Sequence, residues 1–290
     1  PLRSGWVPMG GGSCSCRSAL RSASGSSCRR WWIRSIASGA SWQQVNVGLP
    51  NAVMGVYDVT ISASEPSVIY ARTATGGVFK SLDGGASWNA VSGIADVDFV
   101  VMQPGTPSTI YASTRYRGII KSTDGGNNWT EANAGLPYGS VSLLVFDPLT
   151  PSTMYAARGG LFFKTTDGGT NWYALKTLPP NTVVGHLAID PNNPSTLYVS
   201  TDSGGILKSW DGGESWVLMK ASRFEGFFAN PALAIDPTTP STIYAGSFLT
   251  FSCGYWAVCS NESVSKSTDA YREFWESNTS EQASSPSMPC

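Results

Sequence analysis

Short apolar segments alternate with turn-forming residues along most of the chain, and residues 179–222 show the pattern clearly. Four segments there are rich in apolar, β-branched and aromatic residues: 183–189, 196–201, 206–209 and 215–219. Segments of this composition, bounded by Gly, Pro, Asn and Asp, are typical of β-strands. Apolar residues do not recur at helical spacing over any long stretch, so the sequence predicts an all-β chain with almost no helix.

Two phrases recur in step along the chain. The first, Lys-Ser-Thr-Asp-Gly-Gly-x-x-Trp, has its aspartate at positions 83, 124, 167 and 211, which are 41, 43 and 44 residues apart, and a decayed copy carries Asp269. The second resembles Pro-Ser-Thr-Ile-Tyr-Ala and has its tyrosine at positions 70, 111, 155, 198 and 244. A period of about 40–45 residues with several strands in each repeat predicts a β-propeller of four-stranded blades.

The repeat spacing also sets the expected domain boundaries. We expect a single propeller over 38–277, with blades at 51–92, 93–134, 135–178, 179–222 and 223–277. A fragment around Trp42 would contribute strands to a sixth blade, with five blades or a truncated seven as alternatives. Residues 1–37 are an Arg/Ser/Cys-rich arm, expected to be disordered or non-native, and 278–290 form a C-terminal tail.

The repeated aspartates and tryptophans are expected to be structural. An aspartate at a hairpin tip accepts hydrogen bonds from the backbone of its own turn, and glycine supplies positive φ there. The tryptophan ring would lie between neighbouring sheets, with its N–H donating to a carbonyl group. This interpretation covers Asp83, Trp88, Asp124, Trp129, Asp167, Trp172, Asp211 and Trp216. Calcium binding would require further oxygen ligands at fixed spacing, so we expect no metal and no cofactor.

These motifs resemble the Asp-box (BNR) repeat, Ser-x-Asp-x-Gly-x-x-Trp, over residues 38–275. That repeat is found in sialidases, sortilin-type receptors, photosystem II assembly-factor propellers and xyloglucanases. The pairing with Pro-Ser-Thr-Ile-Tyr-Ala is most similar to the xyloglucanase and assembly-factor branches. The resemblance implies the propeller fold, and it implies either a glycoside hydrolase or a binding protein.

Composition narrows the partner classes. Only 13% of residues are charged and the net charge is −1, so neither nucleic acid nor an anionic membrane is indicated, and no apolar run could span a bilayer. High Gly, Ser, Thr, Trp and Tyr content suits an extracellular or periplasmic protein. Cys253 and Cys259 bracket a short loop, which suggests a disulfide and an oxidising compartment, with two free thiols as the alternative.

One face of the expected propeller collects residues that do not repeat. In a four-stranded blade, the loops between strands two and three and the connections between blades share the face opposite the Asp-Gly-Gly turns. The lysines at 80, 121, 164, 208 and 266 repeat, whereas the arginines on that face do not. Arginine forks bind carboxylates and aromatic rings stack on sugars, so this face is the candidate site. Its ligand-binding candidates are Arg72, Arg115, Tyr116, Arg117, Arg158, His186, Arg223 and Trp256.

Catalysis is the competing interpretation. A glycosidase needs two carboxylates about 5–9.5 Å apart, and Asp58, Asp96 and Asp98 are the candidates. Asp58 and His186 occupy equivalent positions on the first strands of their blades. The xyloglucanase resemblance places a catalytic aspartate where this chain has Ala74, and it implies two propellers rather than one. Sialidase chemistry would need an Arg-Ile-Pro segment that the sequence lacks.

The sequence therefore favours a non-catalytic, extracytoplasmic binding propeller that recognises a glycan or an acidic peptide. The alternative is a glycoside hydrolase of the xyloglucanase or sialidase type acting on polysaccharide. A third possibility is a chaperone that docks the tail of a membrane protein.

Overall fold

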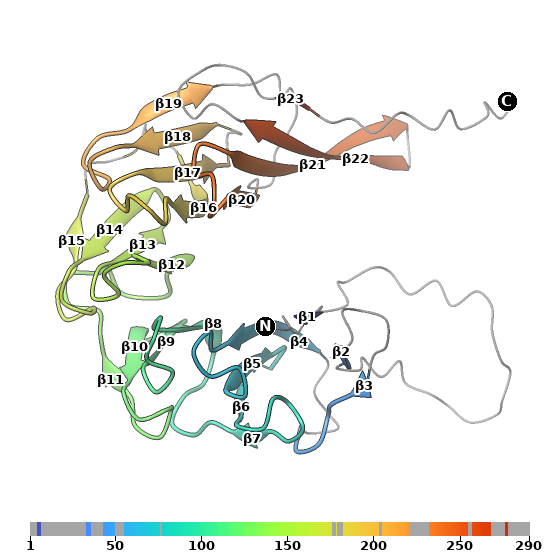
Figure 1. Cartoon of the computed structure of the whole chain (residues 1–290), viewed down its shortest axis with the longest axis vertical. Helices are drawn as coiled ribbons and strands as arrows, with labels where there is room; N and C mark the ends of the chain where they lie inside the picture. The colour runs from blue at the N-terminus through green and yellow to red at the C-terminus, as the bar shows by residue number, and fades with distance from the viewer. Residues whose placement is uncertain are drawn as a thin grey trace, which may run out of the picture. The chain divides into compact units, whose positions relative to one another are not determined.

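The protein is an all-β chain, as the sequence predicts. The computed structural model describes residues 5–6, 33–35, 43–49, 55–75, 77–175, 178, 182–202, 205–220, 232–254, 257–267 and 276–277. These residues form 23 strands in antiparallel sheets, and the described ranges contain no helix (Figure 1).

Five of the sheets are four-stranded, and in each one the strands pair in sequence order. The first blade contains β4 (Val56–Ile61), β5 (Ile69–Thr73), β6 (Val78–Ser81) and β7 (Asn89–Ala90). The second contains β8 (Val97–Met102), β9 (Ile110–Thr114), β10 (Gly118–Ser122) and β11 (Thr130–Glu131). The third contains β12 (Leu143–Phe146), β13 (Met154–Arg158), β14 (Leu161–Thr165) and β15 (Tyr173–Ala174). The fourth contains β16 (Val184–Ile189), β17 (Leu197–Thr201), β18 (Ile206–Ser209) and β19 (Val217–Lys220). The fifth contains β20 (Ala232–Ile235), β21 (Ile243–Gly254), β22 (Ala257–Ser267) and β23 (Glu276–Ser277).

A three-stranded sheet precedes these blades. It consists of β1 (Gly5–Trp6), β2 (Ile33–Ser35) and β3 (Gln43–Gln44). The expected number of blades in the complete propeller stays a prediction.

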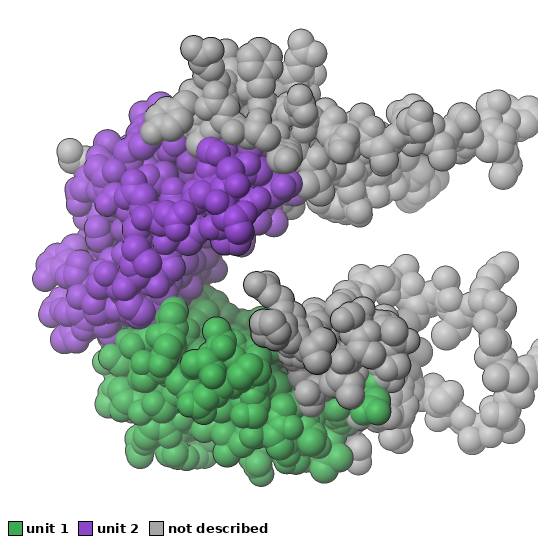
Figure 2. Space-filling view, in the orientation of Figure 1, with its two compact units in different colours: residues 1–132, 138–140 green, residues 133–137, 141–290 purple. Residues whose placement is uncertain are grey.

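The chain divides into two compact units. Unit 1 covers residues 1–132 and 138–140 and holds the first and second blades. Unit 2 covers 133–137 and 141–290 and holds the third, fourth and fifth blades (Figure 2).

Within each unit, the core lies where one blade packs on the next. In unit 1, Tyr70 and Val78 of the first blade pack with Val100 and Ile110 of the second. In unit 2, Phe162 of the third blade packs with Leu187 and Leu197 of the fourth, among other apolar residues. Burying each of these side chains contributes about 1.5–3 kcal/mol, so the contacts between blades are a main source of stability.

The Asp-Gly-Gly turns are held by the hydrogen bonds that the sequence predicts. In the first blade, Asp83 Oδ1 accepts from the Ser87 N–H at 2.9 Å and from Ser81 Oγ at 2.7 Å. The Ser81 hydroxyl also accepts from the Gly85 N–H at 2.7 Å, a role that the sequence did not predict. Asp124, Asp167 and Asp211 make the equivalent bonds in their own turns. The four turns are therefore one repeated structural element.

The tryptophans after these turns follow the expectation only in part. The indole N–H of Trp88 donates to the Val45 carbonyl at 3.0 Å, and that of Trp129 donates to the Gly126 carbonyl at 3.1 Å. For Trp216 the expectation is wrong, because its buried Nε1 has no hydrogen-bond partner among the described residues. Its ring packs edge-on against Phe162, with centroids 5.6 Å apart, so packing rather than a hydrogen bond orients it.

The repeated tyrosines and lysines connect one blade to the next. Tyr70 and Lys80 face each other across β5 and β6, and both donate to the Gly125 carbonyl of the next blade at 3.0 Å. Burial raises the pKa of Tyr70 to about 12, with a further contribution from the charge of Asp124. The lysine ammonium group also lies over the tyrosine ring in the first four blades, at 5.0–5.5 Å from its centroid. The repeated lysine is thus architectural, as the sequence predicts.

Each blade has two ends with different contents. At the end that we name the box end, the Asp-Gly-Gly turn bonds to the turn between strands one and two, for example through Gly84 N–H to the Ser67 carbonyl at 2.9 Å. At the other, the loop end, the second strand finishes beside the start of the first. There the Ala74 N–H donates to the Gly55 carbonyl at 2.9 Å, and the Asp202 N–H donates to the Val183 carbonyl at 3.0 Å. The loop ends carry the candidate site.

Candidate functional site

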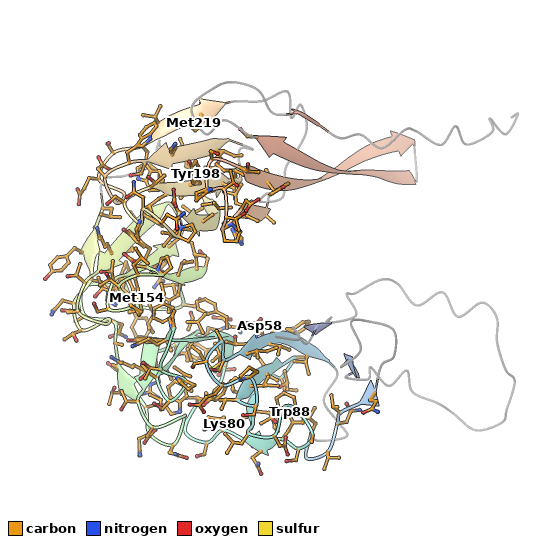
Figure 3. All side chains as sticks on the ribbon, viewed as in Figure 1. Asp58, Lys80, Trp88, Met154, Tyr198 and Met219 are labelled. Atoms are coloured by element: carbon orange, nitrogen blue, oxygen red, sulfur yellow. The ribbon has the colours of Figure 1, made fainter. Side chains whose placement is uncertain are left out.

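The described candidates all lie at loop ends. Asp58 is near the start of β4 and Arg72 near the end of β5, while Asp96 and Asp98 flank the start of β8. Arg115, Tyr116 and Arg117 form the loop between β9 and β10, Arg158 ends β13, and His186 lies near the start of β16. In Figure 3, Asp58 lies at the β4 side of the first blade, away from Lys80 and Trp88.

Unit 1 brings two of these candidates, Asp58 and Arg72, together with Tyr57. The Arg72 guanidinium lies 5.0 Å from the centroid of the Tyr57 ring, and its Nη1 donates to the Val97 carbonyl of the next blade at 3.5 Å. Its Nε is buried and has no hydrogen-bond partner among the described residues. Asp58 is the cross-strand partner of Arg72. We name Tyr57, Asp58 and Arg72 the Arg72 cluster.

The first strand is irregular at this cluster. A β-bulge falls between Val56 and Asp58, so Tyr57 is the extra residue. Its side chain is 59% exposed, although it belongs to an otherwise well-covered strand. A bulge redirects a side chain out of the regular alternation. Tyr57 therefore presents an aromatic surface to solvent beside a cation and a carboxylate.

Asp58 has an environment unlike that of the turn aspartates. Burial raises the pKa of its carboxyl group, while a hydrogen bond from the Val59 backbone and the positive charge of Arg72 partly offset this effect. In contrast, hydrogen bonds from Ser87 and Ser81 lower the pKa of Asp83 to about 2. A half-buried carboxyl group whose charge is only partly compensated is typical of a functional position.

The β9–β10 loop adjoins the start of β8. The Arg115 N–H donates to the Asp96 carbonyl at 3.1 Å, and Arg115, Tyr116 and Arg117 are all exposed. Asp96 has a φ of 51°, and among the described residues it is the one non-glycine residue with positive φ. Such strain is found preferentially at functional sites, although aspartate tolerates this region better than most residues. Asp98 occupies the bulge of β8, equivalent to Tyr57 in β4.

Unit 2 holds two further candidates, Arg158 and His186. The Arg158 Nη1 donates to the Pro137 carbonyl at 2.8 Å, so this arginine fixes its own connecting loop. His186 is half-buried opposite Ser200, and burial lowers its pKa. The prediction that Asp58 and His186 are equivalent holds, because each follows the bulge of its first strand.

Some candidates lie outside the described residues. These are Arg223 and Trp256, together with the side chains of Cys253 and Cys259, so the disulfide stays a prediction. The backbone register of β21 and β22 pairs Cys259 with Phe251. Within the described part of the chain, no group of three or more His, Cys, Asp or Glu residues is placed to hold a metal ion. The described residues also include no apolar helix of the length needed to cross a membrane.

Sequence reasoning missed two residues of the loop ends. The sequence pattern does not single out Tyr57, nor does it single out Ser200, whose buried Oγ has no hydrogen-bond partner among the described residues. The signal for both was positional, since Tyr57 adjoins Asp58 and Ser200 follows the repeated Tyr198 by the same spacing that separates Arg72 from Tyr70.

Comparisons with known proteins identify the fold. No protein-family model matches the sequence, and no curated protein matches it. Solved structures do match. An ancestral GH74 enzyme superposes with a TM-score of 0.64 and 23% identity, over 77% of this chain and 31% of that one. The GH74 enzyme of Niastella koreensis gives a TM-score of 0.67 and 20% identity, over 84% of this chain and 42% of that one.

A second kind of protein is also similar. YCF48 bound to D1 peptide superposes with a TM-score of 0.63 and 16% identity, covering 87% of this chain and 76% of that one. These similarities show that the chain has a β-propeller fold, confirming the expected fold class. The chain spans less than half of the length of the two GH74 structures.

Proposed function

We propose that this chain is a carbohydrate-binding β-propeller that recognises an uncharged glycan at the loop end of unit 1. The observation that carries the proposal is the Arg72 cluster, in which an exposed tyrosine ring lies against a guanidinium group beside a carboxylate. An aromatic surface with a few convergent polar groups is the usual composition of a small-ligand site. The ring would stack on a sugar, and Arg72 and Asp58 would bond its hydroxyl groups.

The charge at this end favours an uncharged ligand over an acidic one. Three arginines and three aspartates lie at the loop ends of the first two blades: Arg72, Arg115, Arg117, Asp58, Asp96 and Asp98. A carboxylate-rich peptide would meet repulsion from the aspartates as well as attraction from the arginines. The similarity to YCF48 bound to D1 peptide supports the peptide alternative.

The similarity to GH74 enzymes supports a glycan and suggests the first one to test. One matching structure is the GH74 xyloglucanase of Xanthomonas campestris, with a TM-score of 0.66 and 16% identity over 84% of this chain and 41% of that one. Xyloglucan oligosaccharides are therefore the first probe. We also propose an extracytoplasmic location, where such polysaccharides occur and where the Cys253–Cys259 disulfide could form.

A glycoside hydrolase is the second candidate, because of Asp58. A carboxyl group whose pKa is raised by burial has the property needed in a proton donor, and Asp96 or Asp98 would supply the second carboxylate. Against this stands Ala74, at the position where the xyloglucanase resemblance implies a catalytic aspartate. We therefore place binding before hydrolysis.

One experiment with purified protein separates these functions. Binding to a glycan array and to an acidic peptide is measured beside reducing-sugar release from xyloglucan. We expect oligosaccharide binding without sugar release, and we expect Arg72→Met to weaken binding about tenfold through the loss of charged hydrogen bonds. Sugar release that disappears in Asp58→Asn would instead establish the hydrolase. Binding to the peptide alone would overturn the glycan proposal.

A further inference from the structure

One pair of positions carries different types of side chain in different blades. It consists of the residue three before the end of the first strand and its partner on the second strand, and we name it the variable pair. Its members are Asp58–Arg72, Phe99–Ser113, Leu143–Ala157, His186–Ser200 and Ala232–Gly246. Only the first and fourth blades have hydrogen-bonding side chains at both positions. These two pairs also hold three of the four buried side-chain atoms without a hydrogen-bond partner among the described residues, namely Arg72 Nε, His186 Nδ1 and Ser200 Oγ.

The fourth-blade pair lies in unit 2 and is a built polar position. Ser200 is fully buried at 0% exposure, whereas His186 is half-buried. The two residues are cross-strand partners on β17 and β16. Cβ atoms of such partners are about 4.5–5.5 Å apart, so the serine hydroxyl can reach the near ring nitrogen by rotation about one bond. Ser200 Oγ and His186 Nδ1 would destabilise the fold if both stayed without hydrogen bonds. The apolar pair of the third blade carries no such cost.

The orientation of His186 decides which nitrogen is available to a ligand. Nδ1 is buried, so a ligand would have to contact the ring through Nε2, which lies on the edge away from Nδ1. Burial lowers the pKa of His186, and no charged group contributes to this effect, so the ring is neutral at pH 7. A neutral imidazole has one N–H donor and one acceptor nitrogen. If Nδ1 accepts from Ser200, Nε2 must carry the proton.

We propose that His186 and Ser200 form a second ligand-binding position, in which the Ser200 hydroxyl donates to Nδ1 and the Nε2–H donates to an uncharged oxygen of the ligand, such as a sugar hydroxyl. Ser200 is a positioning residue, since it acts through the ring rather than on the ligand. The choice of a sugar as ligand rests on the proposed function, whereas the assignment of the ring tautomer rests only on this pair.

The tautomer can be tested without a ligand. His186 is the single histidine of the chain, so its ring gives one set of signals in a ¹⁵N NMR spectrum. At pH 7 we expect a neutral ring protonated on Nε2, and a shift toward a mixture of tautomers in Ser200→Ala. Ser113→Ala is the matched control, because Ser113 occupies the same position opposite Phe99. A ring protonated on Nδ1, or a spectrum unchanged by Ser200→Ala, would overturn the proposal.

The ligand is tested by adding xyloglucan oligosaccharides. We expect the His186 signals to shift and His186→Leu, which copies Leu143 of the third blade, to weaken affinity about tenfold. Binding that leaves the His186 signals and the His186→Leu affinity unchanged would overturn this inference and leave the proposed function intact. Absence of binding by the wild-type protein would overturn the proposed function and the ligand part of this inference together. The ligand-free spectrum would still decide the role of Ser200.

Discussion

Single residues in this repeat protein can be sorted by whether their polar groups are satisfied. The aspartate of each Asp-Gly-Gly turn is surrounded by donors, and the pKa values of Asp83, Asp124 and Asp167 are about 2. Asp58 has the same side chain but a raised pKa, because burial outweighs its favourable contacts. A residue that is unfavourable for stability, and that differs from the residues at the equivalent positions of the other blades, is expected to take part in function.

The Asp58 environment makes a residue-scale prediction. A carboxyl group whose pKa is raised by folding favours the folded state at low pH, and this contribution is lost as pH rises through the folded pKa. Asp58→Asn should therefore melt at a higher temperature than wild type at pH 7, with the difference shrinking as pH falls below the pKa of Asp58. Thermal unfolding monitored by circular dichroism at several pH values would measure this. A variant that is less stable than wild type at pH 7 would mean that the Asp58 charge supports the fold.

The turn element makes the opposite prediction for acid. Its aspartates have folded pKa values of about 2, below the 3.8 of an unperturbed carboxyl group. Their contribution to stability is present above the unfolded pKa and is lost as pH falls toward the folded pKa. The melting temperature should therefore hold from pH 7 to about 5 and fall steeply between about pH 4 and 2, with a shallower fall in Asp83→Asn. An acid transition that begins well above pH 5 would contradict this assignment.

The contact between blades is tested at the glycine of the turn. Gly125 has a φ of +73°, and a Cβ there would lie 2.5 Å from Lys80 Nζ, which donates to the carbonyl of the same residue. Gly105 has a φ of +74° but no atom within 4 Å of its Cβ position, so it is a matched control. Gly105→Ala should cost about 1–2 kcal/mol from backbone strain alone. Gly125→Ala should cost roughly 1–2 kcal/mol more, through the disturbed charged hydrogen bond. Equal losses in urea unfolding would show that the lysine contact adds nothing.

Sequence reasoning succeeded for these elements where contacts are local. The third strand of the fourth blade was expected at 206–209 and is β18, Ile206–Ser209. The bonds to Asp83 were predictable because every partner lies within a few residues of it. The exposure of Tyr57 was not predictable, because a bulge breaks the alternation along the strand from which the direction of each side chain is inferred. The prediction for Trp216 is wrong because the partner of the tryptophan N–H differs from copy to copy: Trp88 donates to Val45, Trp129 donates to Gly126 of its own turn, and Trp216 has no partner among the described residues.

At the scale of the whole molecule, the repeat supplies a scaffold and its exceptions supply the candidate site. The box ends repeat the same hydrogen bonds from blade to blade, whereas the loop ends carry different side chains on the same backbone frame. Loops and strand ends on a rigid scaffold are where binding residues are usually found. Ligand affinity should therefore depend on the loop ends and be insensitive to exposed residues elsewhere.

Calorimetric titration of xyloglucan oligosaccharides into two tyrosine variants tests this claim most directly. Tyr57 is 59% exposed in the Arg72 cluster, and Tyr173 is 63% exposed on β15, outside the loop ends. Tyr57→Ala should lose about tenfold in affinity, since removing a stacking ring is worth on the order of 1–2 kcal/mol, while Tyr173→Ala should bind as wild type does. Equal affinity in the two variants, or a loss confined to Tyr173→Ala, would contradict the account.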